Sequence, residues 1–142
     1  MLLVTGATGT VGSEVLTRLA AQGMRVRAVT RDLRKTAANP LPHVEFVQGD
    51  FEDPESMRRA CSGVSRAFLL SNSTDRAEHQ QIGFIRVAQQ SGVRHIVKLS
   101  QLHADANSPG RFLRYHAAAE AAVQASGSHS RFCGQISICR VC

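Results

Sequence analysis

The chain has 142 residues, of which 43% are apolar and 20% charged, a composition typical of one globular domain with a hydrophobic core. No apolar run approaches the roughly 20 residues that a membrane-spanning helix requires. The first apolar run begins almost at Met1 and leaves no room for a targeting segment. We therefore expect a cytoplasmic protein without a membrane anchor.

The formal net charge is +6, and nearly all of the positive charge comes from arginine. The arginines are scattered and no aromatic stripe accompanies them, so nucleic-acid binding is a minor alternative. The four cysteines do not have the spacing of a structural zinc site, and we expect no metal.

Short apolar runs alternate with segments of helical periodicity along the chain. The runs are typical of buried parallel strands, and apolar residues spaced three and four apart are typical of the helices that cover them. Strands are predicted over residues 2–5, 25–30, 44–47, 67–70 and 94–99. Helices are predicted over residues 11–23, about 54–61, about 75–90 and from about 115 to 127. The second of these helices has the strongest start, because Asp53 can cap it and Pro54 occupies its first position.

This alternation predicts the α/β class, a Rossmann-type, doubly wound parallel sheet. Crossovers between parallel strands are right-handed almost without exception. With strands numbered along the chain, we expect the order 3-2-1-4-5, without later strands. A ligand crevice should lie at the carboxyl ends of the first and fourth strands.

Three glycines, Gly6, Gly9 and Gly12, follow the first strand and open the first helix. The first permits a tight turn, the second lets the backbone approach a pyrophosphate, and the third lets the helix pack against the sheet. The helix N-terminus then faces the phosphates. The alternative is a tight turn without a ligand. The predicted cofactor contacts in this turn are Gly6, Thr8, Gly9, Thr10, Val11 and Gly12.

The end of the second strand carries the residues that choose between NAD and NADP. An acid there binds the ribose 2′-hydroxyl of NAD, whereas an arginine accommodates the 2′-phosphate of NADP. Arg31 comes first and precedes Asp32, and Arg34 and Lys35 follow. This order favours NADP(H) over NAD(H). The alternative is that these charges are only the solvated mouth of the crevice.

Two further segments are expected to line the crevice. Asp50 and Phe51 follow the third strand, where Asp50 can accept a hydrogen bond from the adenine amino group and Phe51 can pack beside the ring. A plain turn ahead of the Asp53 cap is the alternative. Leu70 and Ser71, at the end of the fourth strand, complete the predicted cofactor-binding set.

The motifs together resemble the NmrA-like group of atypical short-chain dehydrogenases/reductases. The resemblance rests on residues 6–12, 29–32, 48–50 and 95–100 and covers about residues 1–127. It implies binding of NAD(P)(H). The group contains both reductases and proteins that sense the redox state of the cofactor, so both functions stay open.

Active short-chain reductases use Ser-Tyr-Lys, in which tyrosine donates a proton and lysine lowers its pKa. Ser100 occupies a position like that of the family serine. Tyr115 is not followed by the required lysine, because position 119 is Ala119.

With only Lys35 and Lys98 in the chain, no Tyr-x-x-x-Lys motif exists. His116 and Glu120 instead resemble the NmrA-like pattern in this region. His116 is a candidate proton donor, and a histidine on the helix surface is the favoured alternative. Lys98 lies inside the fifth strand and receives no role.

The resemblance stops after Gly127, and residues 128–142 show no clear period. Codons can be chosen for residues 127–142 so that the same DNA, read in a second frame that starts at the third base of the first codon, encodes a different peptide. That frame gives Ile-Pro-Phe-Thr-Ile-Leu-Arg-Pro, which resembles the sixth strand of NmrA-like proteins. We therefore expect an NAD(P)-binding domain over residues 1–127 and a frameshifted, non-native tail over residues 128–142. The sheet edge at the fifth strand should then lack a neighbour.

The expected parent is an oxidoreductase that transfers hydride from NADPH to a small acceptor such as a quinone or carbonyl. The absence of Tyr-x-x-x-Lys favours the alternative, a redox-sensing protein that acts through a regulatory protein partner. Besides the dinucleotide, the expected partners are therefore a small substrate or such a regulator, with no membrane.

Overall fold

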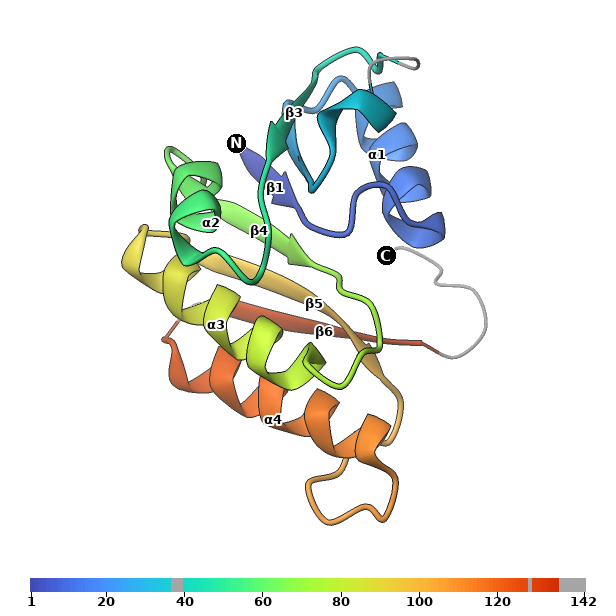
Figure 1. Ribbon diagram of the computed structural model, residues 1–142, viewed down its shortest axis with the longest axis vertical. Coiled ribbons are helices and arrows are strands. Elements are labelled where there is room, and N and C mark those ends of the chain that lie inside the picture. Colours follow the sequence, from blue (N-terminus) through green and yellow to red (C-terminus); the bar gives the residue numbers. More distant parts are fainter. Residues whose placement is uncertain (37–39, 128, 136–142) are drawn as a thin grey trace.

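The computed structural model describes residues 1–36, 40–127 and 129–135 (Figure 1). Its strands are β1 (Leu2–Val4), β2 (Val26–Thr30), β3 (Val44–Gln48), β4 (Arg66–Leu69), β5 (His95–Gln101) and β6 (His129–Gln135). Its helices are α1 (Thr10–Ala21), α2 (Pro54–Cys61), α3 (Ala77–Gln90) and α4 (Arg111–Ala125), with a 3₁₀ turn, η1 (Leu33–Lys35). Asp53 caps α2 as expected, since its Oδ1 accepts hydrogen bonds from the amides of Glu55 and Ser56.

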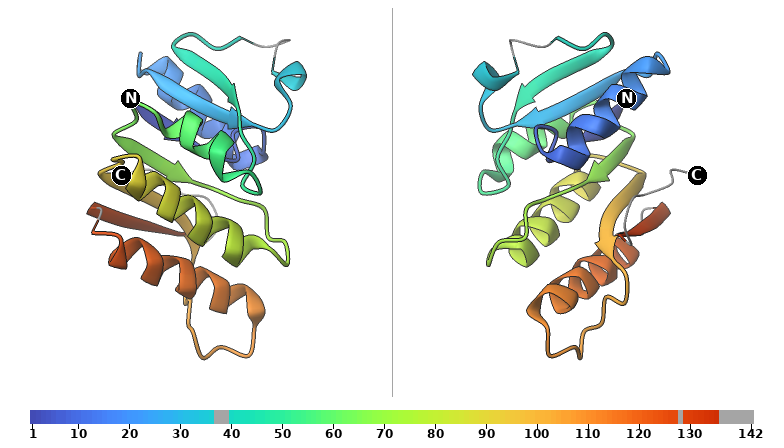
Figure 2. Two further views of the ribbon diagram at one scale, coloured as in Figure 1. Left: turned by 60° about the vertical axis from the view of Figure 1, so that its left-hand side comes forward. Right: turned by 90° about the vertical axis from the view of Figure 1, so that its right-hand side faces the viewer.

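The strands form one parallel sheet in the order β3-β2-β1-β4-β5-β6, which confirms the predicted order of the first five. Neighbouring residues of β1 face opposite sides of this sheet. Leu3 packs with residues of α2, α3 and α4, whereas Val4 packs with residues of α1. Helices therefore cover both faces, as a doubly wound sheet requires (Figure 2). No helix in the described part of the chain is long and apolar enough to cross a membrane.

The expectation that the sheet lacks later strands is wrong. β6 pairs with β5 in parallel along its whole length, from His95↔His129 to Gln101↔Gln135. Gly127, with φ +69°, follows the end of α4, where the chain turns back toward the sheet. The edge of β5 presents backbone N–H and C=O groups that an extended segment of almost any composition can pair. The predicted non-native tail is therefore a strand over residues 129–135, while residues 128 and 136–142 lie outside the described residues.

Candidate dinucleotide-binding site

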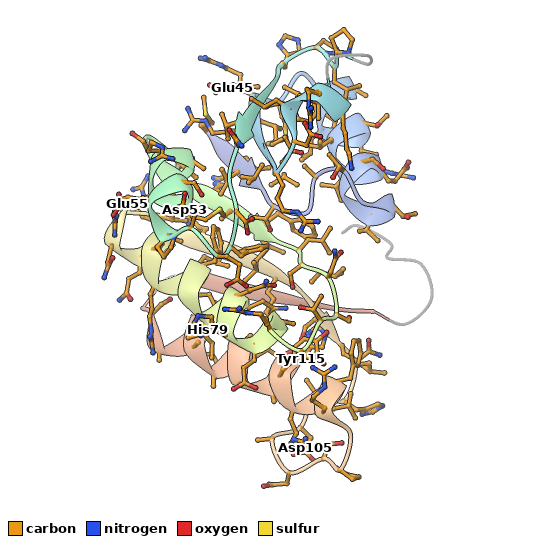
Figure 3. The ribbon with its side chains drawn as sticks, in the orientation of Figure 1. Glu45, Asp53, Glu55, His79, Asp105 and Tyr115 are labelled. Carbon is orange, nitrogen blue, oxygen red and sulfur yellow. The ribbon has the colours of Figure 1, made fainter. Side chains whose placement is uncertain are left out.

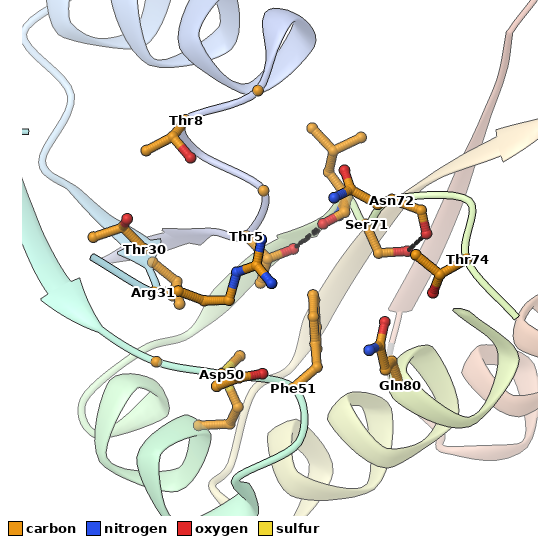
Figure 4. Close-up of a pocket in the computed structure, with 16 residues that line it drawn as sticks. Thr5, Thr8, Thr30, Arg31, Asp50, Phe51, Ser71, Asn72, Thr74 and Gln80 are labelled. Carbon is orange, nitrogen blue, oxygen red and sulfur yellow. Dashed lines mark hydrogen bonds between the residues drawn. The ribbon is translucent and has the colours of Figure 1, made fainter. Parts of the chain in front are cut away.

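A cavity of about 330 Å³ opens at the carboxyl edge of the sheet. The turn after β1, the ends of β2 and β3 and the loop after β4 form its walls (Figure 4). This is the crevice that the strand order predicts, beside the first and fourth strands. Eight of the predicted cofactor residues line it, namely Gly6, Thr8, Gly9, Arg31, Asp50, Phe51, Leu70 and Ser71. Thr10, Val11 and Gly12 stand behind the turn in α1 and are not part of the lining.

The turn after β1 excludes side chains at two glycines. Gly6 has φ +60°, and a Cβ there would lie 2.8 Å from the carbonyl oxygen of Leu70. A Cβ on Gly12 would lie 2.1 Å from the carbonyl oxygen of Gly6, so α1 can pack against the turn only because Gly12 lacks a side chain. Gly9 caps α1 without a side-chain hydrogen bond, and the first turn of the helix contains no acid. Its amide groups therefore suit an anion such as a pyrophosphate.

Thr5 fixes this turn to β4, a role that the sequence did not reveal. Its hydroxyl donates to the carbonyl oxygen of Leu70 and accepts from the Leu70 amide, each at 2.8 Å. These two hydrogen bonds hold the ends of β1 and β4 together at the border of the cavity. The signal in the sequence is a polar residue at the end of an otherwise apolar run, and the structure shows that this residue is 1% exposed.

Arg31 and Asp32 are neighbours in the sequence but differ in their contacts, because Arg34 pairs with only one of the two, Asp32. The Arg34 guanidinium binds Asp32 with two hydrogen bonds, from Nε at 3.0 Å and from Nη2 at 3.1 Å. The Arg34 side chain and backbone amide hold the pKa of the Asp32 carboxyl below its usual value. Arg31 makes no ion pair with any described residue, and its guanidinium reaches over the cavity (Figure 4).

Aromatic and polar groups form the opposite wall. Phe51 packs edge-on against Phe84, with ring centroids 5.9 Å apart, and also lines the cavity. Asp50 lies beside it, and its Oδ1 accepts from the Glu52 amide at 3.0 Å. Sequence reasoning missed the contributions of Asn72, Thr74 and Gln80 to the lining. Asn72 and Thr74 follow β4 in a loop without a regular pattern, and Gln80 lies in the first turn of α3.

Ser100 and His116 lie outside the cavity lining and inside the protein. His116 is 7% exposed, so the favoured prediction of a surface histidine is wrong. α4 packs against β5, and the His116 imidazole there contacts the ammonium of Lys98, which is 0% exposed. Burial, and then the Lys98 charge, lowers the pKa of His116 from 6.5 to about 4. Burial lowers the pKa of Lys98 from 10.5 to about 8, against the opposing effect of Glu120.

The fold and the cavity define a Rossmann-type dinucleotide-binding domain. The sequence matches the family described as NAD(P)H-binding over residues 6–130. This chain therefore belongs to the NAD(P)H-binding family. The NAD(P)(H)-binding domain that the resemblance to NmrA-like proteins implied is confirmed by this match.

Two similar proteins are reductases. A (4-alkanoyl-5-oxo-2,5-dihydrofuran-3-yl)methyl phosphate reductase of Streptomyces griseus is 38% identical over 128 residues, which are 89% of this chain and 44% of that protein. The structure of an NADPH-dependent quinone oxidoreductase of Escherichia coli, complexed with NADPH, is 27% identical with a TM-score of 0.82, over 93% of this chain and 47% of that one.

NmrA, a negative transcriptional regulator, shares the fold at 21% identity with a TM-score of 0.78, over 92% of this chain and 44% of that one. This chain thus spans about half the length of the relatives it matches.

Proposed function

We propose that this chain is the cofactor-binding part of an NADPH-dependent reductase that acts on a small acceptor such as a quinone or carbonyl. The observation that carries the proposal is the cavity in which the glycine turn and the Arg31 guanidinium face one another across the ends of β1 and β2. A pyrophosphate fits the amides of the turn, and a 2′-phosphate fits the unpaired arginine.

NADPH is favoured over NADH because the two charges at the end of β2 are not equivalent. The Asp32 carboxylate, which would have to bind a ribose 2′-hydroxyl, is already engaged by Arg34. Arg31 has no such partner among the described residues and lines the cavity. A doubly charged phosphate is thereby attracted, while the hydroxyl of NADH gains nothing comparable.

The remaining lining residues would hold the other parts of the dinucleotide. Asp50 and Phe51 would contact the adenine, and Ser71 would contact the ribose and phosphate side of the cofactor. NADPH, when bound, supplies a hydride, which delivers two electrons to the acceptor. We infer the acceptor class from two of the similar proteins, the quinone oxidoreductase and the (4-alkanoyl-5-oxo-2,5-dihydrofuran-3-yl)methyl phosphate reductase. The regulatory alternative has support only from a shared fold.

We also propose that residues 128–142 are read in a shifted frame and that the native domain resembles its relatives up to residue 127. The observation behind the proposal is the loss of the NmrA-like pattern after Gly127, and the family match ends close by, at residue 130. Sequencing of the coding DNA tests the proposal. It predicts that the second frame stays open beyond the triplets for residue 142 and encodes a substrate-binding part, and a stop codon soon after would contradict it.

Turnover by the frame-restored protein tests the reductase proposal. We expect NADPH to be consumed in the presence of a small quinone, and NADH to be consumed more slowly. The loss of absorbance of the reduced cofactor measures both rates. The variant Gly12→Ala serves as the control for non-enzymatic oxidation. If the protein binds NADPH but consumes none with a panel of quinones and carbonyls, the reductase proposal is wrong and the redox-sensing alternative gains support.

A further inference from the structure

A buried polar cluster joins β5 to α4 beside the cofactor cavity. Lys98 Nζ lies 2.7 Å from His116 Nδ1, 3.2 Å from Ser100 Oγ and 3.3 Å from the carbonyl oxygen of Leu99. Ser100 Oγ donates to Glu120 Oε1. Lys98, Ser100 and His116 are 0%, 3% and 7% exposed. Such a group of polar side chains persists inside a protein only when its hydrogen bonds are satisfied.

The hydrogen-bond assignments follow from the number of protons. A lysine ammonium has three protons and no lone pair, so it must donate to all three of its neighbours. His116 Nδ1 must therefore accept, which leaves the proton of a neutral imidazole on Nε2. Ser100 has one proton and gives it to Glu120, so its oxygen can offer a further partner only a lone pair.

The protonation states agree with this assignment. At neutral pH, a Lys98 pKa of about 8 leaves the amine mostly charged, and a His116 pKa of about 4 leaves the ring neutral. Among the described residues, the charged groups of the cluster are Lys98 from β5 and Glu120 from α4 itself. Ser100 Oγ also lies 3.4 Å from His116 Nδ1, and with its proton given to Glu120 it leaves the assignment of that nitrogen to Lys98. The rings of Phe112 and Tyr115 lie beside the imidazole, with centroids at 4.8 and 4.4 Å.

The cluster lies next to the end of the cavity. Lys98 is paired in register with Leu69, and the next residues of that strand end, Leu70 and Ser71, line the cavity. Ser100 follows Lys98 by two residues at the same carboxyl edge. Tyr115, on α4 (Figure 3), has its hydroxyl 2.9 Å from Ser73 Oγ, in the loop that contributes Asn72 and Thr74 to the lining.

We propose that Lys98 is a positioning residue that selects the Nε2–H tautomer of His116 and fixes Ser100 against Glu120. Position 120 is the fourth residue after His116, and in Tyr-x-x-x-Lys reductases the fourth residue after the proton donor is a lysine. Here that position is acidic, and the cation comes from β5 instead. His116 can then donate a hydrogen bond only through Nε2, and Ser100 serves as an acceptor rather than as a donor to a substrate carbonyl.

The nitrogen spectrum of the His116 ring in the cofactor-free chain tests this assignment. We expect the shifts of a neutral imidazole with its proton on Nε2, unchanged between pH 5.5 and 7.0, a range above the His116 pKa of about 4 and below the Lys98 pKa of about 8. A proton on Nδ1 would overturn the proposal. The inference rests on the proposed function only for its effect on a substrate, and this measurement needs no cofactor, so failure of NADPH binding and failure of the tautomer assignment are separate results.

The variant Lys98→Met tests the role of the ammonium itself. Methionine nearly matches the lysine stem in length but cannot donate, so we expect the His116 pKa to rise by about one unit or more and the Nδ1–H tautomer to become populated. NADPH affinity should stay within about threefold, because the cluster does not touch the turn. Lys35 is the other lysine of the chain and is exposed, and Lys35→Met should leave the pKa and the tautomer of His116 unchanged.

A folded Lys98→Met protein with an unchanged His116 pKa and tautomer would overturn the proposal. If this variant does not fold, the tautomer in the unmodified chain decides alone.

Discussion

Gly12→Ala is expected to weaken cofactor binding strongly and to destabilise the domain by about 2 kcal/mol or more. The new Cβ would meet the carbonyl oxygen of Gly6 at 2.1 Å, and that atom belongs to backbone that cannot rotate away. Either α1 moves off the sheet or the turn opens. Because the turn carries the amides for the pyrophosphate, we expect NADPH affinity to fall by roughly 100-fold or more, about 2.8 kcal/mol.

Gly83→Ala is the matched control for this substitution. Gly83 also lies in a helix, α3, but a Cβ there meets nothing within 4 Å. We expect unchanged NADPH binding and a gain in stability of up to about 1 kcal/mol from helix propensity. Chemical denaturation and calorimetric titration of both variants measure these effects. Wild-type NADPH affinity in Gly12→Ala would show that the turn does not hold the cofactor.

Arg31→Ala is expected to weaken NADPH binding by roughly 10- to 100-fold, which corresponds to the loss of one strong charge-assisted contact of about 1.5–3 kcal/mol. The affinity for NADH should remain within about threefold, since its ribose hydroxyl does not need the guanidinium. The ratio of the two affinities, measured by titration, isolates the contribution of the 2′-phosphate from any general effect on the fold.

Arg18→Ala provides the same change in net charge at a distance from the cavity. Arg18 forms an exposed pair with Glu14 on α1, with side chains 66% and 59% exposed, and such pairs contribute little. We expect no change in the ratio of the two affinities. Equal losses of NADPH and NADH affinity in Arg31→Ala would contradict the assignment of this arginine to the 2′-phosphate.

The sequence was most informative where structure depends on local chemistry. Alternating apolar runs and helical segments gave the order of the first five strands, because right-handed crossovers leave few other topologies. The roles of Gly6 and Gly12 in the turn could also be predicted, because each occupies a backbone position that has no room for a side chain. Arg31 also lines the cavity as expected.

Contacts between distant segments were beyond this kind of reasoning. β6 forms through backbone pairing, which places few constraints on the order of apolar and polar side chains, so the sequence showed no periodicity that predicts this strand. Lys98 shares the buried face of β5 with Ile96 and Ser100, and a lysine at such a position is understood only when α4 supplies its acceptor. The hydrogen bonds from Thr5 to Leu70 likewise join residues 65 positions apart.

Calorimetric titration of the chain with NADPH and with NADH tests the central claim most directly, namely that the glycine turn and Arg31 form a site for a phosphorylated dinucleotide. The account predicts one NADPH per chain and affinity for NADPH that exceeds the affinity for NADH by at least about tenfold. Circular dichroism of the same sample verifies that the helices and sheet are present. A folded chain that binds neither cofactor would contradict the account, as would a chain that prefers NADH.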